Sequence, residues 1–394
     1  MTLDNYRHLY VIIEQEEGKI IPVSLEMLGE ARRLMDDFNN KYSCDEKVVA
    51  VFLGDKIKDY SNDLIAHGAD VVIYADNPEL RYVRNTIYTK LIAQFATDTD
   101  VPNKVEPTGT GFKRPRYMFF AADSIGRQLS ATVMAELDSG LASDINKLVI
   151  EDLQITHQNK TGGKPLTFEK TLEMYRPDFS GFLWTTILCL DNKNPALERD
   201  YHPQACSMIP GAFAAIESDY KRDGIIIEYM PKFEEQDLKV RVLDRKIIKS
   251  VVDYDAYKSI VSFGRGIKDA PEENIKLIEN LASELDAAIG ISLPLSKKPF
   301  PVNQTLDSTY FIADRVIGTS GRKVGPKVYV AVGISGASQH IAGMKDSEFI
   351  VAINPDESSI IKDECDIFIK GRMEDVIPIL AEKIKAQKLV VQVK

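Results

Sequence analysis

VYVAVGISGASQH, residues 328–340, is the stretch that decides the fold of the C-terminal half of this chain. Its first five residues are apolar and predict a short buried strand, and Ser338 onward predicts a helix. Between them, Gly333 and Gly336 allow backbone to come close to a ligand, and free N–H groups at a helix start attract phosphate oxygens. The spacing therefore predicts a site for a nucleotide pyrophosphate, although a tight strand-to-helix turn without a ligand would give the same pattern.

Working outward, the N-terminal half alternates strand and helix patterns, and Ser24 can cap the first predicted helix. Repeated strand–helix units predict an α/β fold with a mainly parallel sheet covered by helices. Strands are expected at 9–13, 47–54, 71–74 and 116–122, and helices at 24–31 and through 91–95.

A second α/β layer is expected after a charge-rich stretch, residues 217–239. At 394 residues the chain exceeds the size of one core, so two domains are predicted, 1–216 and 217–394. In the second, strands are expected at 257–263, 328–332, 349–353 and 367–369, the last three apolar enough to be central. An amphipathic helix is expected at 271–289, and a closing helix at 373–387 interrupted by Pro378.

Composition argues against several classes of partner and site. A net charge of −10 argues against nucleic acid as a partner. The four cysteines have no Cys-x-x-Cys spacing, so no metal site is expected. No run of eighteen apolar residues and no signal-type segment is visible, which predicts a cytoplasmic protein without a membrane span.

The quoted stretch continues as HIAGMKDS, residues 340–347, and VAINPD, residues 351–356. This run resembles the FAD-binding signature of the electron transfer flavoprotein alpha subunit family. Further similar segments follow in family order over nearly the whole chain, at 22–31, 121–129, 140–144, 175–181 and 202–204. The resemblance implies an N-terminal α/β domain that contacts a beta subunit in a heterodimer. It also implies a C-terminal domain of the deoxyhypusine-synthase-like type that holds FAD in an extended pose.

Carried over position by position, the resemblance implies a set of FAD-binding residues. His340 is expected near the flavin O2, where a cationic or hydrogen-bonding imidazole would stabilise negative charge on the reduced ring. Arg265 is expected at a phosphate or beside the flavin, Ser292 at a phosphate, and Ser320 at N5 or O4 of the ring. The full set is Arg265, Ser292, Ile317, Gly318, Thr319, Ser320, Ser335, Gly336, Ala337, Ser338, Gln339, His340, Asn354, Arg372 and Met373. Without the resemblance, residues 318–321 would be read as a turn and His340 as a structural histidine.

The chain departs from the family pattern at three places. Ser292 is normally followed by an arginine, but here by Leu293, which should lower the flavin's reduction potential unless Arg315, Arg322 or Lys297 fills the space. Thr319-Ser320 replaces the usual Gln-Thr. Arg372-Met373 replaces an Asp-Leu pair at the adenosine ribose, a loss that Asp366 or Asp375 could offset. The segment 157–170 is predicted to be an exposed loop.

Three functions remain open from the sequence. The leading one is an electron-carrier subunit that moves electrons between an acyl-CoA dehydrogenase-type flavoenzyme and another redox partner; no catalytic nucleophile–base pair is apparent, so enzyme activity of the chain alone is left undecided. A sharper alternative is the alpha subunit of an NADH-dependent, electron-bifurcating complex, with ferredoxin as a further partner. The third is an adenine-nucleotide-binding protein without a flavin.

Overall fold

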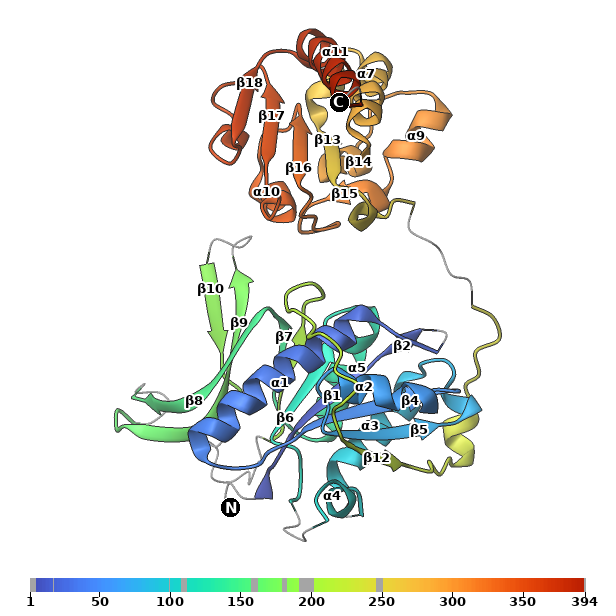
Figure 1. Cartoon of the computed structure of the whole chain (residues 1–394), viewed down its shortest axis with the longest axis vertical. Coiled ribbons are helices and arrows are strands. Elements are labelled where there is room, and N and C mark those ends of the chain that lie inside the picture. The colour runs from blue at the N-terminus through green and yellow to red at the C-terminus, as the bar shows by residue number, and fades with distance from the viewer. Residues whose placement is uncertain are drawn as a thin grey trace. The chain divides into compact units, whose positions relative to one another are not determined.

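The computed structural model of the chain describes residues 5–16, 18–98, 100–107, 112–156, 162–178, 183–190, 202–245 and 251–392. Contacts divide the chain into two compact units (Figure 1). The first unit ends at Arg245, and the described part of the second begins at Val251. Among the described helices, none is both long enough and apolar enough to cross a membrane.

The first unit contains a seven-stranded parallel sheet with strand order β12-β5-β4-β1-β6-β11-β7. Side chains alternate between the two faces of a strand, so Val11 joins one hydrophobic cluster and Tyr10 the other. The strands are β1 (Leu9–Ile13), β4 (Val48–Gly54), β5 (Val71–Asp76), β6 (Tyr117–Ala121), β7 (Leu141–Ile145), β11 (Gln204–Met208) and β12 (Ile225–Glu228).

Helices cover both faces of this sheet. Buried residues of α1 (Pro22–Tyr42) and α2 (Ser61–Ala66) belong to one cluster. Those of α3 (Asn85–Thr97), α4 (Asp100–Val105) and α5 (Ser124–Glu136) belong to the other. The prediction of a parallel sheet with helical layers is therefore confirmed.

Two predictions for this half were wrong. The domain boundary does not fall after residue 216, because β12 pairs with β5 and places residues 217–245 in the first unit. The predicted loop 157–170 is wrong from Leu166 onward, where β9 (Leu166–Asp178) begins; residues 157–161 lie outside the described part of the chain. β9 forms an antiparallel sheet with β8 (Lys147–Ile155) and β10 (Leu183–Ile187), and β2 (Gln15–Glu16) pairs with β3 (Lys19–Ile20).

The second unit contains a six-stranded parallel sheet with order β15-β14-β13-β16-β17-β18. The strands are β13 (Ser259–Phe263), β14 (Ala287–Ser292), β15 (Val316–Ile317), β16 (Val328–Val332), β17 (Ile350–Asn354) and β18 (Ile367–Lys370). The helices are α7 (Pro271–Leu285), α8 (Leu293–Lys297), α9 (Gln304–Tyr310), α10 (Ser338–Met344) and α11 (Met373–Gln392), which runs on through Pro378.

Three details differ from the sequence-based expectation here. α11 is continuous through Pro378, where an interruption was predicted. The helix predicted for 271–289 ends at Leu285, because Asp286 adopts a left-handed conformation (φ 51°) and β14 begins at the next residue. β18 is an edge strand rather than a central one, and Ile367 is 46% exposed.

Strand order in the second sheet positions a site. The chain moves from β13 outward to β14 and β15, and then returns to the other side of β13 with β16, β17 and β18. The loops that leave β13 and β16 therefore diverge at the carboxyl edge of the sheet. Open α/β sheets bind ligands in the crevice at such a reversal.

Candidate functional site

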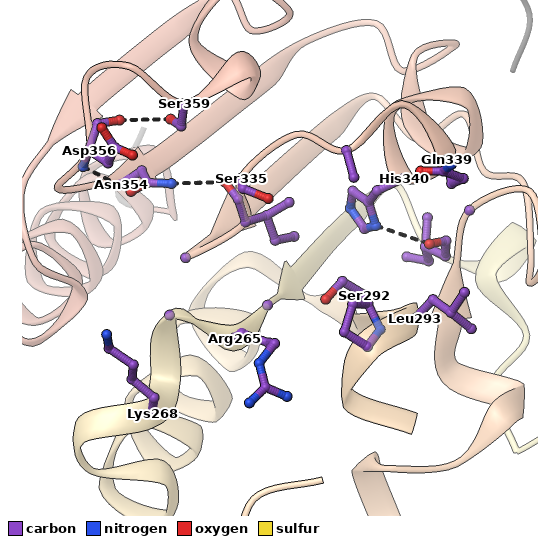
Figure 2. Close-up of a pocket in the computed structure, with 18 of the residues that line it drawn as sticks. Arg265, Lys268, Ser292, Leu293, Ser335, Gln339, His340, Asn354, Asp356 and Ser359 are labelled. Atoms are coloured by element: carbon purple, nitrogen blue, oxygen red, sulfur yellow. Dashed lines mark hydrogen bonds between the residues drawn. The ribbon is translucent and has the colours of Figure 1, made fainter. Parts of the chain in front are cut away.

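A cavity of about 620 Å³ lies at this reversal, lined by the loops that follow five strands of the sheet. It has the size of a small-molecule or cofactor site. Of the predicted site residues, the cavity brings together Arg265, Ser292, Ile317, Gly318, Thr319, Ser320, Ser335, Ala337, Gln339, His340 and Asn354. Figure 2 shows Asn354, Asp356 and Ser359 on one side of the view and Gln339, His340 and Leu293 on the other, with Arg265 between them.

Glycines bring two of the loops into direct contact. A Cβ on Gly264 would lie 2.6 Å from the carbonyl oxygen of Gly333, and one on Gly266 would lie 2.6 Å from the Cα of Gly333. Gly333 itself has φ 59°, a conformation that favours glycine. The floor of the cavity is therefore main chain that no side chain can replace without moving the loops apart.

The loop after β16 offers a run of hydrogen-bond donors. Within the described part of the chain, the backbone N–H groups of residues 334–339 donate to no group of the protein, whereas those of Gly333 and His340 do. Successive free N–H groups are suited to the oxygens of a phosphate or pyrophosphate. The anion site predicted from the quoted stretch thus has the donors it needs.

Gly336 and Ser338 belong to this loop and helix but do not line the cavity. Gly336 has φ 84°, and a Cβ there would lie 2.3 Å from the backbone nitrogen of Ile361. Ile361 N–H donates to the carbonyl of Ser335 at 3.2 Å, so Gly336 lets the short helix Ile360–Lys362 support the loop from behind.

Two positive side chains reach the cavity. Arg265 lies with its guanidinium 4.5 Å from the centre of the Phe300 ring and donates to the carbonyl of Lys298 at 3.1 Å. Stacking on one aromatic face leaves the rest of its donor fork for a planar or anionic ligand group. Lys268 lines the cavity one helical turn further along, and sequence reasoning missed it although it follows Arg265 by three residues.

His340 is buried, with 5% of its surface exposed. Its Nδ1 lies 3.0 Å from the carbonyl oxygen of Ile317, and its Nε2 lies 2.9 Å from the hydroxyl of Tyr329. Burial lowers the pKa of His340 to about 4, which the hydrogen bond to Ile317 only partly offsets. A pKa this low keeps the imidazole neutral at pH 7, so of the two forms that the resemblance implies the structure favours the hydrogen-bonding imidazole over the cationic one.

At the other end, Asn354 is held by main chain. Its amide nitrogen donates to the carbonyl of Ile334 at 2.9 Å, and its amide oxygen accepts from the N–H of Asp356 at 3.0 Å. Asp356 and Ser359 also line the cavity and were not predicted; a carboxylate two residues after a central strand is the signal that could have found Asp356. Hydrogen bonds from Ser358 lower the pKa of Asp356, so it is an anion at neutral pH.

Arg372 and Met373 do not line the cavity, contrary to the prediction. Arg372 is 56% exposed at its side chain and pairs with Asp269 at 2.9 Å and Glu374 at 3.5 Å. Met373 is 4% exposed and packs in the core beneath Gly333. Asp366 and Asp375 are not among the lining residues either, which leaves Asp356 as the carboxylate at this end among the described residues.

None of the three proposed substitutes lines the cavity. Arg315 lies over the Tyr310 ring and donates to the carbonyls of Thr309 and Ile289. Arg322 and Lys297 are not lining residues. Leu293 thus presents an apolar surface where the family pattern has a cation.

Together these groups fit an elongated ligand with an anionic centre. Backbone donors and Arg265 serve its middle, Asn354 and Asp356 offer polar groups at one end, and Ile317, Leu293 and His340 form a mostly apolar, uncharged wall at the other. A dinucleotide with a planar ring system, such as FAD, has this distribution of groups. The residues present therefore fit the cofactor that the resemblance implies.

Comparison with known proteins finds a separate family model for each half of the chain. Residues 253–345 match the family model described as the electron transfer flavoprotein FAD-binding domain, and residues 9–171 match the electron transfer flavoprotein domain. The electron transfer flavoprotein subunit alpha of Thermoanaerobacterium thermosaccharolyticum is 32% identical over 387 residues, covering 98% of this chain and 100% of the relative.

Two further relatives align with this chain over almost the full length of both proteins. The protein FixB of Clostridium saccharobutylicum is 32% identical over 392 residues, with 98% of each chain covered. The acryloyl-CoA reductase electron transfer subunit beta of Anaerotignum propionicum is 30% identical over 397 residues, again with 98% of each covered.

Proposed function

Because the chain belongs to the electron transfer flavoprotein alpha subunit family, we propose that the cavity of its second unit holds FAD, with the pyrophosphate on the loop at residues 333–337. The observation that carries this assignment is the run of free N–H groups at residues 334–339, opposite Arg265 and Lys268. Bound FAD supplies the electron-accepting and electron-donating group that amino-acid side chains lack.

The chain's own residues then have separate tasks. The 334–339 N–H groups and Arg265 bind the negative centre of the cofactor, and Phe300 holds the guanidinium in place. The loop at residues 317–320, tied to α10 through His340, forms the wall for the ring system. Asn354 donates to the carbonyl of Ile334 and so holds the loop at residues 333–337 in place, which arranges its N–H donors before the ligand binds.

A titration of the FAD-free chain with FAD tests the site. The expected stoichiometry is one FAD per chain. Arg265→Ala should raise the FAD dissociation constant by about tenfold to a hundredfold, because a charge-assisted hydrogen bond is worth about 1.5–3 kcal/mol. Arg322→Ala, which removes an exposed arginine outside the cavity, is the matched control. Equal constants for Arg265→Ala and the parent would contradict the assignment.

For the electron route, the proposed partners are an electron transfer flavoprotein beta subunit, as a heterodimer, and an acyl-CoA dehydrogenase-type flavoenzyme. The Anaerotignum relative supports this class, since its name assigns it to an acryloyl-CoA reductase. Co-purification with a beta subunit, followed by reduction with an acyl-CoA and its dehydrogenase, is the test. Flavin of the heterodimer that stays oxidised under these conditions would refute the route.

A second candidate is an NADH-dependent, bifurcating complex, which the absence of a cation at Leu293 favours because an apolar wall disfavours negative charge on a reduced ring. Addition of NADH to the heterodimer distinguishes the two. Two FAD per heterodimer with rapid bleaching by NADH supports the bifurcating type, and with it ferredoxin as a further partner. One FAD without a response to NADH supports the simple carrier.

A further inference from the structure

The nitrogen atoms of the His340 ring are both directed at groups of the protein. Nδ1 lies 3.0 Å from the carbonyl oxygen of Ile317 on β15. That oxygen can only accept a hydrogen bond, so the contact requires the proton on Nδ1. In a neutral ring Nε2 is then an acceptor, and the Tyr329 hydroxyl at 2.9 Å is its donor.

Tyr329 is suited to remain that donor. Its side chain is fully buried on the central strand β16, and burial raises the pKa of its hydroxyl, so the hydroxyl keeps its proton. Its ring centre lies 6.2 Å from that of His340, and the two rings are tilted by 58°, so they are not stacked. Their contact is the hydrogen bond between the hydroxyl and Nε2.

The position of the proton on His340 matters for the loop beside it. The Ile317 carbonyl that accepts from Nδ1 immediately precedes Gly318, and the N–H of Thr319 donates to the carbonyl of Gln339 at 2.9 Å. A Cβ on Gly343 would lie 2.4 Å from the Cα of Gly318, so loop and helix touch through glycine backbone. With the proton on Nε2 instead, the bare Nδ1 would face the carbonyl oxygen and one of these two hydrogen bonds would be lost.

We propose that Tyr329 is a positioning residue: its hydroxyl fixes the proton of His340 on Nδ1 and thereby holds the loop Gly318–Ser320 against α10. Tyr329 does not line the cavity and acts only through His340. The consequence for the cofactor rests on the proposed function, since this loop is the wall assigned to the flavin ring. The assignment of the His340 proton to Nδ1 is independent of the proposed function.

Nitrogen NMR of the full chain, labelled with ¹⁵N at histidine and free of FAD, tests the first part. The expected spectrum has one histidine with a protonated Nδ1 and an unprotonated Nε2 that disappears in His340→Asn. A proton on Nε2, a doubly protonated ring at pH 7, or rapid exchange between tautomers in the parent would overturn the proposal. The NMR experiment uses the chain without FAD, so its result does not depend on the cofactor. Failure of the chain to bind FAD would refute the proposed function but would leave the tautomer of His340 as measured.

Tyr329→Phe tests the second part, with Tyr254→Phe as its control. Tyr254 is buried in the same hydrophobic cluster, but its hydroxyl reaches the carbonyls of Ile289 and Arg315 instead of His340. Tyr329→Phe should give a mixed tautomer signal and an FAD dissociation constant raised about fivefold, the effect of one buried hydrogen bond. Tyr254→Phe should keep the parent tautomer.

An unchanged tautomer in Tyr329→Phe would overturn the role given to the hydroxyl. Equal loss of FAD affinity in both variants would also overturn it, because general loosening of the core would then explain the effect. If Tyr329→Phe does not fold, NMR of the parent decides the role of the hydroxyl: a Tyr329 hydroxyl proton that shows coupling to Nε2 of His340 would support it, and a hydroxyl proton that shows none would overturn it.

Discussion

At the scale of single residues, Leu293 sets the electrostatics of one end of the cavity. It follows Ser292 at the start of α8, and no arginine or lysine other than Arg265 and Lys268 is among the described lining residues. An apolar side chain gives no stabilisation to negative charge, whereas a cation at about 4 Å is worth about 4 kcal/mol at an effective dielectric of 20. The residue at position 293 is therefore expected to tune the potential of the bound cofactor.

We predict that Leu293→Arg raises the midpoint potential of the bound FAD, by the equivalent of about 1–4 kcal/mol depending on how far solvent screens the new charge. Potentiometric titration of the FAD-loaded protein measures this. Leu293→Met, which keeps volume without charge, is the control and should leave the potential unchanged. A potential that is the same in Leu293→Arg and the parent would show that position 293 does not face the ring.

Glu14 is a second residue with an unusual environment. It lies at the carboxyl end of β1 with 6% of its surface exposed, and among the described residues neither side-chain oxygen finds a geometrically well-formed hydrogen bond. Burial, with the neighbouring charge of Asp123, raises the pKa of Glu14 to about 9. Asp123 itself caps α5, accepting from the N–H groups of Ile125 and Gly126. Glu14 is thus held in its protonated form.

The pKa of Glu14 is higher in the folded chain than in the unfolded chain, where it is 4.5. The stability contributed by Glu14 is therefore complete at pH values below 4.5 and is lost as the pH rises towards about 9. Glu14→Gln removes this loss, since an amide does not ionise. We therefore expect it to stabilise the chain by about 2–4 kcal/mol at pH 8 and by nearly nothing at pH 4. Urea unfolding at the two pH values measures the difference, with the exposed Glu235→Gln as control. An equal effect at both pH values would rule out the titration of Glu14 as its cause.

At the scale of elements, the loop between β16 and α10 depends on support from the helix Ile360–Lys362. Gly336 is the point of closest approach, with φ 84° and the Ile361 nitrogen 2.3 Å from where a Cβ would lie. The donors at residues 334–339 are arranged by this contact and by the Asn354 side chain rather than by the seven-residue helix α10 alone.

Gly336→Ala should therefore both destabilise the second unit, by about 2–4 kcal/mol, and raise the FAD dissociation constant at least about tenfold. Gly211→Ala is matched in conformation (φ 79°), but a Cβ there would have no atom of the described residues within 4 Å, so the substitution should cost only the conformational strain of about 1–2 kcal/mol. Chemical denaturation and FAD titration of both variants separate crowding from strain. Equal results for the two would mean that the contact with Ile361 is unimportant.

At the scale of the whole molecule, the two units each have their own hydrophobic cores. Two clusters belong to the seven-stranded sheet, and two others to the six-stranded sheet that carries the cavity. A ligand stabilises whatever folded part binds it, by about 2.7 kcal/mol at a concentration of 100 times its dissociation constant. FAD should therefore act on the unfolding of the second unit.

We expect two thermal transitions, of which FAD raises only one. Ile278→Ala, in α7 of the second unit, should lower that same transition, and Ile73→Ala, in β5 of the first, should lower the other. Each substitution removes a fully buried side chain and should cost about 2–5 kcal/mol. Calorimetry with and without FAD measures the assignment. A shift by FAD of the transition that Ile73→Ala lowers would contradict it.

The sequence alone determined the features that depend on local pattern. Short apolar runs predicted several of the buried strands, among them β1, β4 and β16, although not β11, and their alternation with helical patterns predicted two parallel sheets with helices. The Gly-rich turn at residues 333–336 predicted the anion site, because glycine spacing at a strand end is visible in the chain itself. The resemblance, in this stretch and in the segments around residues 265, 292 and 317–320, named about half of the residues that line the cavity.

Only the tertiary structure decided what depends on contacts between distant segments. β12 joins the first sheet through pairing with β5, which moves the boundary past residue 216. Asp269 and Glu374 hold Arg372 outside the cavity, while Asp356 lies in it. Tyr329 and Ile317, 11 and 23 residues away in sequence, hold the neutral ring of His340. The physical reason is the same in each case: hydrogen bonding and burial are set by neighbours in space, and a local pattern does not contain them.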